Sequence, residues 1–140
     1  MLLIIIISAC YKTEDDATQK ARKIIEYNKQ KFDNLPLSGK IVNGAREIEI
    51  KAIQYRWEPD TIVVKKGEKI KFIVSSEDSP HGFELEGLMI PELDTSKPIK
   101  KGDKIVAETT ADQVGSWDMV CTVYCGPGHP GMRGKYIVRG

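Results

Sequence analysis

The sequence is poor in several features that mark common classes of protein. Its 140 residues carry a net charge of only +1 at pH 7, so no strongly basic field is available to bind nucleic acid. Histidine occurs twice and cysteine three times. The apolar run at residues 2–7 is shorter than the about 20 residues that a transmembrane helix requires. We therefore expect no nucleic-acid partner, and a metal site that uses histidine and cysteine has few of these residues available.

Most of these rare residues gather in one segment, CTVYCGPGHPGM, at residues 121–132. Two cysteines, a histidine and a methionine follow the spacing Cys-x3-Cys-x3-His-x2-Met. Thiolate, imidazole and thioether together favour copper, because soft sulfur ligands hold Cu(I) and imidazole suits both oxidation states. Two thiolates on one loop can bridge two copper ions, each of which then needs one histidine. The second histidine, His81, lies upstream in the segment DSPHGFEL.

These two segments resemble the dinuclear copper centre, CuA, of cytochrome c oxidase subunit II, and the resemblance covers roughly residues 44–140. It implies two bridging thiolates, a histidine and a methionine on one copper ion, and a histidine and a backbone carbonyl on the other. In that order, the implied ligands are Cys121, Cys125, His81, Met132, His129 and Val123.

Val123 departs from the pattern of the family. Many members carry a carboxylate at this position, and its side chain helps to bind a magnesium ion against subunit I. Valine cannot supply that ligand. We expect the copper site to survive, because it uses only the main chain of Val123, and the usual magnesium site to be missing.

The same residues allow other interpretations. A structural zinc site could use both loop cysteines and both histidines, although Met132 counts against zinc because a thioether is a poor zinc ligand. The two loop cysteines could also form a disulfide in the metal-free protein in an oxidising compartment, which would block copper loading. Asp78, three residues before His81, either accepts a hydrogen bond that steadies the loop or is a solvated surface carboxylate.

The N-terminal residues resemble a bacterial lipoprotein signal. The apolar run ends in Ile7-Ser8-Ala9-Cys10, which is similar to a lipobox. In that interpretation the signal-like segment 1–9 is removed and Cys10 is lipidated, which anchors the protein on the periplasmic or extracytoplasmic face of the membrane. No Lys or Arg precedes the run, and the run is shorter than usual; a start codon assigned too far downstream would explain both features. The alternative is a remnant of a larger membrane helix.

Residues 10–44 are predicted to form a lipid-anchored helical stalk and linker. Acidic residues precede basic ones, the order that suits a helix dipole, and we expect a helix over 14–31 capped by Thr13. It would be roughly 27 Å long and could hold the following domain away from a membrane; the alternative is a helix lying on that domain. Residues 33–44 are expected to be a linker. The predicted helix has a narrow apolar stripe that consists of Ala17, Ala21, Ile24, Ile25 and Phe32.

From residue 45 the apolar pattern has a period of two, which is typical of β-strands. Ile48, Ile50 and Ala52 lie on one face before the pattern shifts, which predicts a bulge near Ala52. About seven short strands separated by turn residues indicate a sandwich or barrel. With the resemblance above, we expect an all-β, cupredoxin-like Greek-key fold for residues 45–140, with an N-terminal helix. The other predicted strands are 61–65, 69–75, 81–85, 104–109, 115–121 and 135–139.

The resemblance implies a function in electron transfer. The chain would take single electrons from cytochrome c or another soluble donor and pass them to subunit I of a haem-copper oxidase. We identify no residues for general acid-base or nucleophilic catalysis, so the oxygen chemistry would belong to the partner. The alternative is a free-standing periplasmic CuA electron carrier or a copper-handling protein, which Val123 favours.

Overall fold

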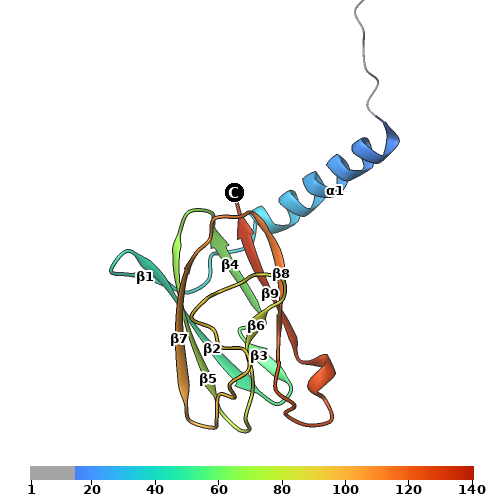
Figure 1. The fold of residues 1–140 in the computed structure, drawn as a ribbon. Coiled ribbons are helices and arrows are strands. Elements are labelled where there is room, and N and C mark those ends of the chain that lie inside the picture. Colours follow the sequence, from blue (N-terminus) through green and yellow to red (C-terminus); the bar gives the residue numbers. More distant parts are fainter. Residues whose placement is uncertain (1–14) are drawn as a thin grey trace, which may run out of the picture.

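The computed structural model describes residues 15–140, so the signal-like segment 1–9, Cys10 and Thr13 lie outside the described residues. Two β-sheets pack face to face, and one α-helix precedes them (Figure 1). Within residues 15–140, no helix combines the length and the apolar character needed to cross a lipid bilayer.

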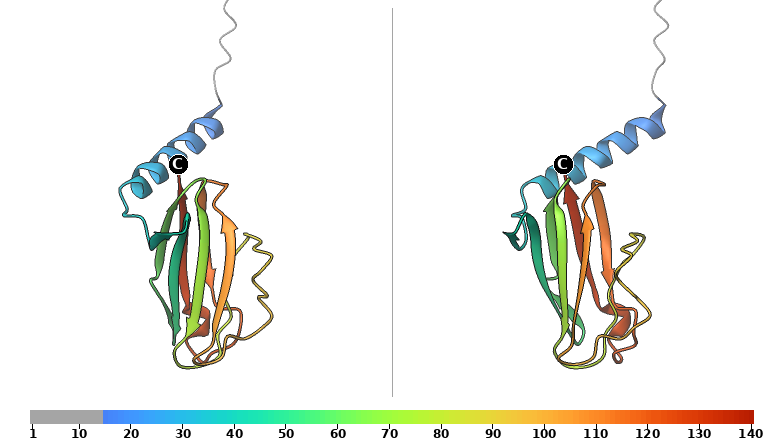
Figure 2. Two further views of the ribbon diagram at one scale, coloured as in Figure 1. Left: turned by 90° about the vertical axis from the view of Figure 1, so that its left-hand side faces the viewer. Right: turned by 60° about the vertical axis from the view of Figure 1, so that its left-hand side comes forward.

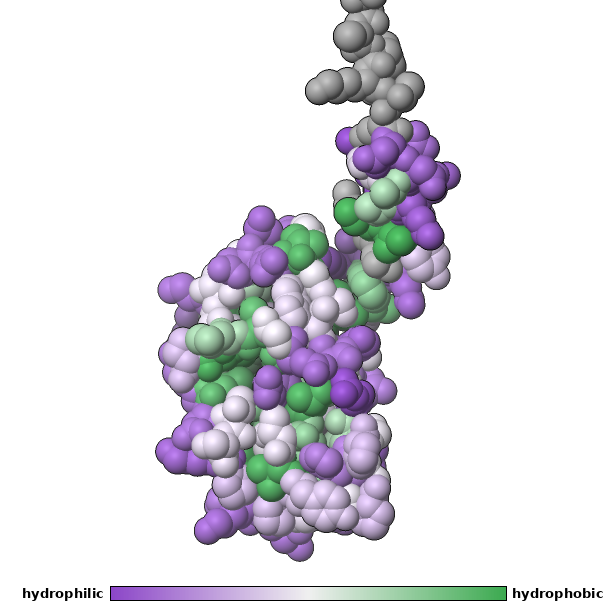
Figure 3. Space-filling view, turned by 45° about the vertical axis from the view of Figure 1, so that its right-hand side comes forward, coloured by the Kyte–Doolittle hydropathy of each residue, from purple (hydrophilic) through white to green (hydrophobic). Residues whose placement is uncertain are grey.

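Helix α1, Asp16–Asp33, projects from one end of the sandwich (Figures 1 and 2). It begins two residues later than predicted because the side chain of Asp15 caps it, accepting a 2.7 Å hydrogen bond from the backbone N–H of Thr18. Ile24 and Ile25 of the predicted apolar stripe are exposed. Figure 3 shows the helix extending away from one end of the sandwich, with hydrophobic and hydrophilic residues side by side on its surface. The C-terminal turn of the helix contacts β9, where the side chain of Arg139 donates a hydrogen bond to the carbonyl of Asp33.

Nine strands form the two sheets in the described part of the chain. One sheet has the order β1-β2-β5-β7, with β3 also paired to β2, and the other has the order β4-β9-β8-β6. Both sheets are mixed, because β2 and β5 run parallel, as do β4 and β9. The bounds are β1 Lys40–Val42, β2 Ala45–Ile53, β3 Arg56–Glu58, β4 Thr61–Lys65, β5 Lys69–Ser76, β6 Glu84–Leu85, β7 Lys104–Thr110, β8 Gly115–Val120 and β9 Arg133–Arg139.

The core lies between the sheets and follows from the alternation in the sequence. The apolar residues expected to point inward from β2 and β5 are buried, because alternate side chains of a strand face opposite sides of its sheet. Four aromatic rings fill the centre, with ring centroids 5.3 to 6.1 Å apart from neighbour to neighbour. In order of contact, these rings belong to Trp57, Phe83, Phe72 and Tyr136. The predicted all-β sandwich with an N-terminal helix is confirmed.

The structure differs from the sequence prediction at three strands. The predicted bulge near Ala52 is wrong, because the chain reverses at Gln54 and Tyr55 and returns as β3 against the end of β2. Part of the predicted linker forms strand β1, which pairs with the beginning of β2 through a turn at Asn43-Gly44 where both residues have positive φ. The strand predicted at 81–85 is reduced to β6. Each difference concerns a short strand at a sheet edge.

The two ends of the sandwich carry different features. Helix α1 and the C-terminus lie at one end, and the loop between β8 and β9 lies at the other (Figures 1 and 2). At the helix end, the side chain of Arg46 is 8% exposed, and its guanidinium lies 2.6 Å from the carboxylate of Glu68. Arg46 also donates a 2.7 Å hydrogen bond to the backbone carbonyl of Ser38, which fixes the segment leading into β1.

Candidate metal centre

The cysteine-rich segment forms the loop between β8 and β9. Cys121 follows β8 directly, and Cys125 is inside the loop. A short 3-10 helix, His129–Gly131, then turns the chain so that Met132 precedes β9. Backbone hydrogen bonds from His129 to the Gly126 carbonyl and from Met132 to the His129 carbonyl hold this turn. The loop therefore presents four side chains from a compact, hydrogen-bonded backbone.

His81 comes from the loop that follows β5. Its backbone forms a bridge with Ile99, with hydrogen bonds of 3.1 and 2.7 Å in the two directions. The next residue, Gly82, approaches the cysteine loop so closely that a Cβ there would lie 2.0 Å from Oγ1 of Thr122. This approach places the imidazole of His81, which is completely buried, against the cysteines.

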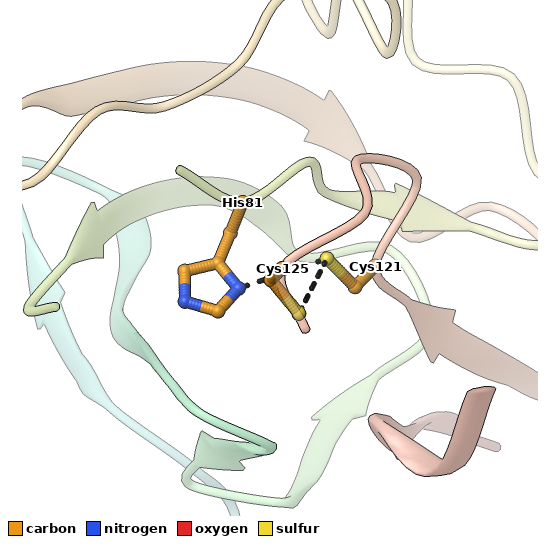
Figure 4. Close-up of side chains that lie close together, drawn as sticks. All are labelled: His81, Cys121 and Cys125. Carbon is orange, nitrogen blue, oxygen red and sulfur yellow. Dashed lines mark hydrogen bonds between the residues drawn. The ribbon is translucent and has the colours of Figure 1, made fainter. Parts of the chain in front are cut away.

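The side chains of His81, Cys121 and Cys125 point toward one another (Figure 4). Nδ1 of His81 lies 3.7 Å from Sγ of Cys121, and the two sulfur atoms are 4.0 Å apart. In the described part of the chain, this is the one group of three or more His, Cys or carboxylate side chains whose ligand atoms all lie within 4.8 Å of one another.

The other predicted ligands surround the same sulfur pair. Nδ1 of His129 lies 3.7 Å from Sγ of Cys125, and Sδ of Met132 lies 3.9 Å from it. The backbone carbonyl oxygen of Val123 lies 3.1 Å from Sγ of Cys121. The structure thus brings all six predicted site residues together, and a different histidine lies beside each cysteine sulfur.

Both loop cysteines are buried and free. Burial raises the pKa of the Cys125 thiol to about 11, and the neighbouring sulfur of Cys121 adds to the shift because two thiolates so close together would repel each other. In the metal-free protein the Cys125 thiol is therefore protonated at neutral pH. A cation at this position would remove that repulsion and replace the proton.

Asp78 is not a solvated surface residue but holds the buried histidine. Its Oδ1 lies 2.8 Å from Nε2 of His81, and its Oδ2 accepts a 2.6 Å hydrogen bond from the backbone N–H of Gln54. Burial opposes ionisation of Asp78, but the hydrogen bonds from Gln54, His81 and Ser79 outweigh it and lower the pKa of the carboxyl. The arrangement leaves Nδ1 of His81 free to face the cysteines.

Two further residues, Gln54 and Tyr55, reach the site from the turn between β2 and β3. The side-chain amide of Gln54 donates a hydrogen bond to the backbone carbonyl of Cys125. The side chain of Tyr55 lies over the cysteine loop, since a Cβ on Gly126 or Gly128 would come within 2.4 Å of one of its atoms. The sequence interpretation missed Gln54, because nothing in the local sequence distinguishes this residue, which is 71 residues from Cys125.

The sequence was compared with the families of known proteins. Residues 1–138 match the family of cupredoxin-like domains. The chain belongs to this family, as the alternation of its strands and the position of the cysteine loop predict.

Two similar proteins are subunits of oxidases. Cytochrome c oxidase subunit 2 of Thermus thermophilus is 29% identical over 92 residues, which cover 66% of this chain and 64% of the relative. Quinol oxidase subunit 2 of Sulfolobus acidocaldarius is 35% identical over 71 residues, covering 48% of this chain and 40% of the relative. This chain thus spans less than two thirds of the length of either protein. The resemblance to oxidase subunit II is confirmed.

A solved structure supports the same fold. The periplasmic domain of subunit II of the cytochrome oxidase of Bradyrhizobium japonicum superposes with a TM-score of 0.55 at 16% identity, covering 71% of this chain and 87% of that one. At this level of identity the likeness concerns the fold alone.

Proposed function

We propose that this chain holds two copper ions in a CuA-type centre and transfers single electrons as a subunit II-like component of a haem-copper terminal oxidase. One observation carries the proposal: the two buried sulfur atoms lie 4.0 Å apart, and each has its own imidazole nitrogen at 3.7 Å. A pair of bridging thiolates with one terminal histidine at each end requires this arrangement. When bound, the copper pair would supply one-electron redox chemistry.

The donor set fits copper better than a single zinc ion. A tetrahedral zinc site would need all four ligand atoms within roughly 3 to 4 Å of one another, given metal–ligand distances of about 2.0 to 2.3 Å. Nδ1 of His129 is close to Cys125 but falls outside the group of His81, Cys121 and Cys125, so at least one of its distances within that group exceeds 4.8 Å. The thioether of Met132 beside the same sulfur pair also favours copper.

The protein contributes rigidity and exclusion of water. Cys121, Cys125, Met132 and His81 are buried, and their loops project from two hydrogen-bonded sheets. Ligands held in this way move little when the charge of the site changes, which keeps the reorganisation that accompanies electron transfer small. His129 is only partly buried and lies in contact with the exposed ring of Tyr124, at a centroid distance of 5.7 Å. This side of the centre is the one that a soluble donor could approach.

The proposed copper centre can be tested by adding copper to the purified protein under oxygen-free conditions. We expect two copper ions per chain, a purple visible spectrum and a seven-line hyperfine pattern in electron paramagnetic resonance. Metal analysis that finds one zinc ion and no copper would overturn the assignment.

The partner is inferred from the relatives, which are subunits of a cytochrome c oxidase and of a quinol oxidase. We propose an extracytoplasmic location, with subunit I of a haem-copper oxidase as electron acceptor and cytochrome c or another soluble protein as donor. The chain should then co-purify in mild detergent with a haem-containing membrane protein, and its copper should be oxidised when oxygen is admitted. A chain that purifies alone would support the alternative of a free-standing periplasmic electron carrier or copper-handling protein.

Val123 provides a test of the proposed ligand pattern, because many subunits II carry a carboxylate at this position. Its carbonyl faces Cys121, whereas its side chain has no group that could bind magnesium. Val123→Glu should therefore leave the copper spectrum nearly unchanged, because only the main chain is proposed to bind copper. A large spectral change would show that the loop does not follow the proposed ligand pattern.

Attachment to a membrane is a separate proposal that depends on Cys10. Acyl chains on this cysteine would anchor the protein upstream of α1. Bacterial expression should then give a membrane-associated protein, and Cys10→Ala should release it or leave the signal uncleaved. An unmodified Met1 at the N-terminus in the native host would contradict lipidation.

A further inference from the structure

The turn between β2 and β3 reaches both of the loops that carry the proposed copper ligands. Gln54 and Tyr55 form its tip, at the same end of the sandwich as the cysteine loop (Figure 1). One loop carries Asp78 and His81 and follows β5, and the other carries the two cysteines and follows β8. The ligand loops thus share a neighbour that is itself no ligand.

Gln54 makes one hydrogen bond to each loop. Its backbone N–H donates to Oδ2 of Asp78 at 2.6 Å, and the other oxygen of that carboxylate lies 2.8 Å from Nε2 of His81. Its side-chain amide donates to the carbonyl of Cys125. A chain of hydrogen bonds therefore runs from the His81 imidazole through Asp78 and Gln54 to the backbone of Cys125.

Tyr55 closes the same region by packing. Its side chain occupies the space in which side chains at positions 126 and 128 would otherwise lie: an ideal Cβ at 126 would be 2.4 Å from the hydroxyl oxygen, and one at 128 would be 2.3 Å from the ring. The cysteine loop is therefore held by a hydrogen bond at Cys125 and covered by an aromatic ring over the two glycines that follow.

We propose that Gln54 is a positioning residue for the metal centre: it sets the distance between the loop of His81 and the loop of Cys125. The inference rests on the proposed copper function, because positioning matters only where both loops bind the same metal centre. The two links of Gln54 can be separated experimentally. A substitution removes the amide bond to Cys125 but keeps the backbone N–H that binds Asp78.

The metal-free protein gives the first test. Gln54→Met keeps the length of the side chain but cannot donate, and Gln54→Glu places a carboxylate against the Cys125 carbonyl. Gln113→Met is the matched control, because Gln113 is exposed in the turn between β7 and β8, at the opposite end of the sandwich. We expect amide hydrogen exchange at His129, whose N–H bonds to Gly126 within the loop, to be at least about tenfold faster in both Gln54 variants. Exchange in β5 should match the control.

Copper release gives the second test. Residues that orient metal ligands typically change metal affinity about 10- to 100-fold when mutated. Transfer of copper to a chelator should therefore be at least about tenfold faster from Gln54→Met than from Gln113→Met, with a changed hyperfine pattern in electron paramagnetic resonance.

The combined outcomes separate this proposal from the copper function. If the wild-type chain binds no copper, the proposed function fails and the positioning role fails with it, even if exchange confirms the structural link. If the wild-type chain binds copper but Gln54→Met matches the control in exchange and release, only the role of Gln54 is overturned. Faster exchange with unchanged copper release would also overturn it, since Gln54 would then hold the loop without positioning the metal.

Discussion

Nε2 of the buried His81 lies 2.8 Å from Oδ1 of Asp78, so the imidazole turns its other nitrogen, Nδ1, toward Sγ of Cys121. A carboxylate on one nitrogen fixes the tautomer and the ring orientation, and makes the other nitrogen a better metal ligand. The hydrogen bond also satisfies a polar atom of a side chain that has no access to water. The same contact thus serves both the fold and the proposed metal centre.

Replacing Asp78 should weaken metal binding without abolishing the fold. Asp78→Asn keeps the size of the side chain but removes the charge and one of the two acceptor oxygens that Gln54 and His81 use. We expect copper affinity to fall about tenfold or more, measured by competition with a chelator. Asp112→Asn is the control, because Asp112 is exposed in the turn between β7 and β8, at the opposite end of the sandwich. Wild-type affinity in Asp78→Asn would mean that Asp78 does not orient a ligand.

The proposed ligands should differ in importance. Cys121→Ser and Cys125→Ser should each lose the dinuclear centre, because both sulfur atoms are proposed to bridge the copper ions. Met132→Leu should retain copper, since leucine has a similar volume in this buried position, and should raise the reduction potential because a weak thioether ligand is lost. Copper content and a redox titration measure the two effects. Equal copper loss in all three variants would contradict this order.

The sequence predicted the proposed ligands better than their supports. The ligand loop could be interpreted because Cys121, Cys125, His129 and Met132 are close together in the chain, and only His81 had to be brought from elsewhere. Gln54 has no such signature: it is an ordinary polar residue until the fold sets it beside the Cys125 carbonyl. Long-range contacts of this kind leave no local pattern.

In the fold, too, the features with a local sequence pattern were predicted and those that depend on contacts were not. The regular alternation in β2 and β5 predicted their buried faces, because one side of each strand faces the core. After Ala52 the apolar residues shift to the other face, a pattern that fits either a bulge or a hairpin. The antiparallel pairing of β3 with β2 shows that it is a hairpin. Thr13 and Asp15 were both suitable helix caps by residue type, and the hydrogen bond to Thr18 selects Asp15.

Gly128 should tolerate no side chain while Tyr55 is in place. A Cβ there would lie 2.3 Å from Cδ2 of the Tyr55 ring, so Gly128→Ala must displace the ring or the loop. We expect the metal-free protein to lose about 1 kcal/mol or more of unfolding free energy, as overpacking usually costs. The backbone φ of Gly128 is −84°, which alanine adopts readily, so the steric contact is the cause. In denaturant titrations, the further change Tyr55→Ala should make Gly128→Ala nearly neutral; an undiminished cost would place the strain elsewhere.

Stability in acid should depend on the ion pair at the opposite end of the sandwich. The hydrogen bond from Arg46, which outweighs the effect of burial, lowers the pKa of Glu68 below its ordinary value of 4.5. The folded state therefore binds the Glu68 proton less tightly than the unfolded chain does. The stabilisation is fully present above the unfolded pKa and is lost as the pH falls through the lower, folded pKa. The wild-type protein should begin to lose this contribution below about pH 4.5.

Glu68→Gln isolates that contribution. The variant leaves the nearly buried guanidinium of Arg46 without its charged partner, and removing one member of such a pair costs roughly 1 to 3 kcal/mol. At neutral pH, Glu68→Gln should therefore unfold at lower denaturant concentration than the wild type, and the difference should shrink as the pH falls below about 4.5. Glu92→Gln, at an exposed carboxylate, should follow the wild type throughout. A difference between Glu68→Gln and the wild type that stays constant down to strongly acid pH would show that packing of the side chain, not its charge, stabilises this end of the sandwich.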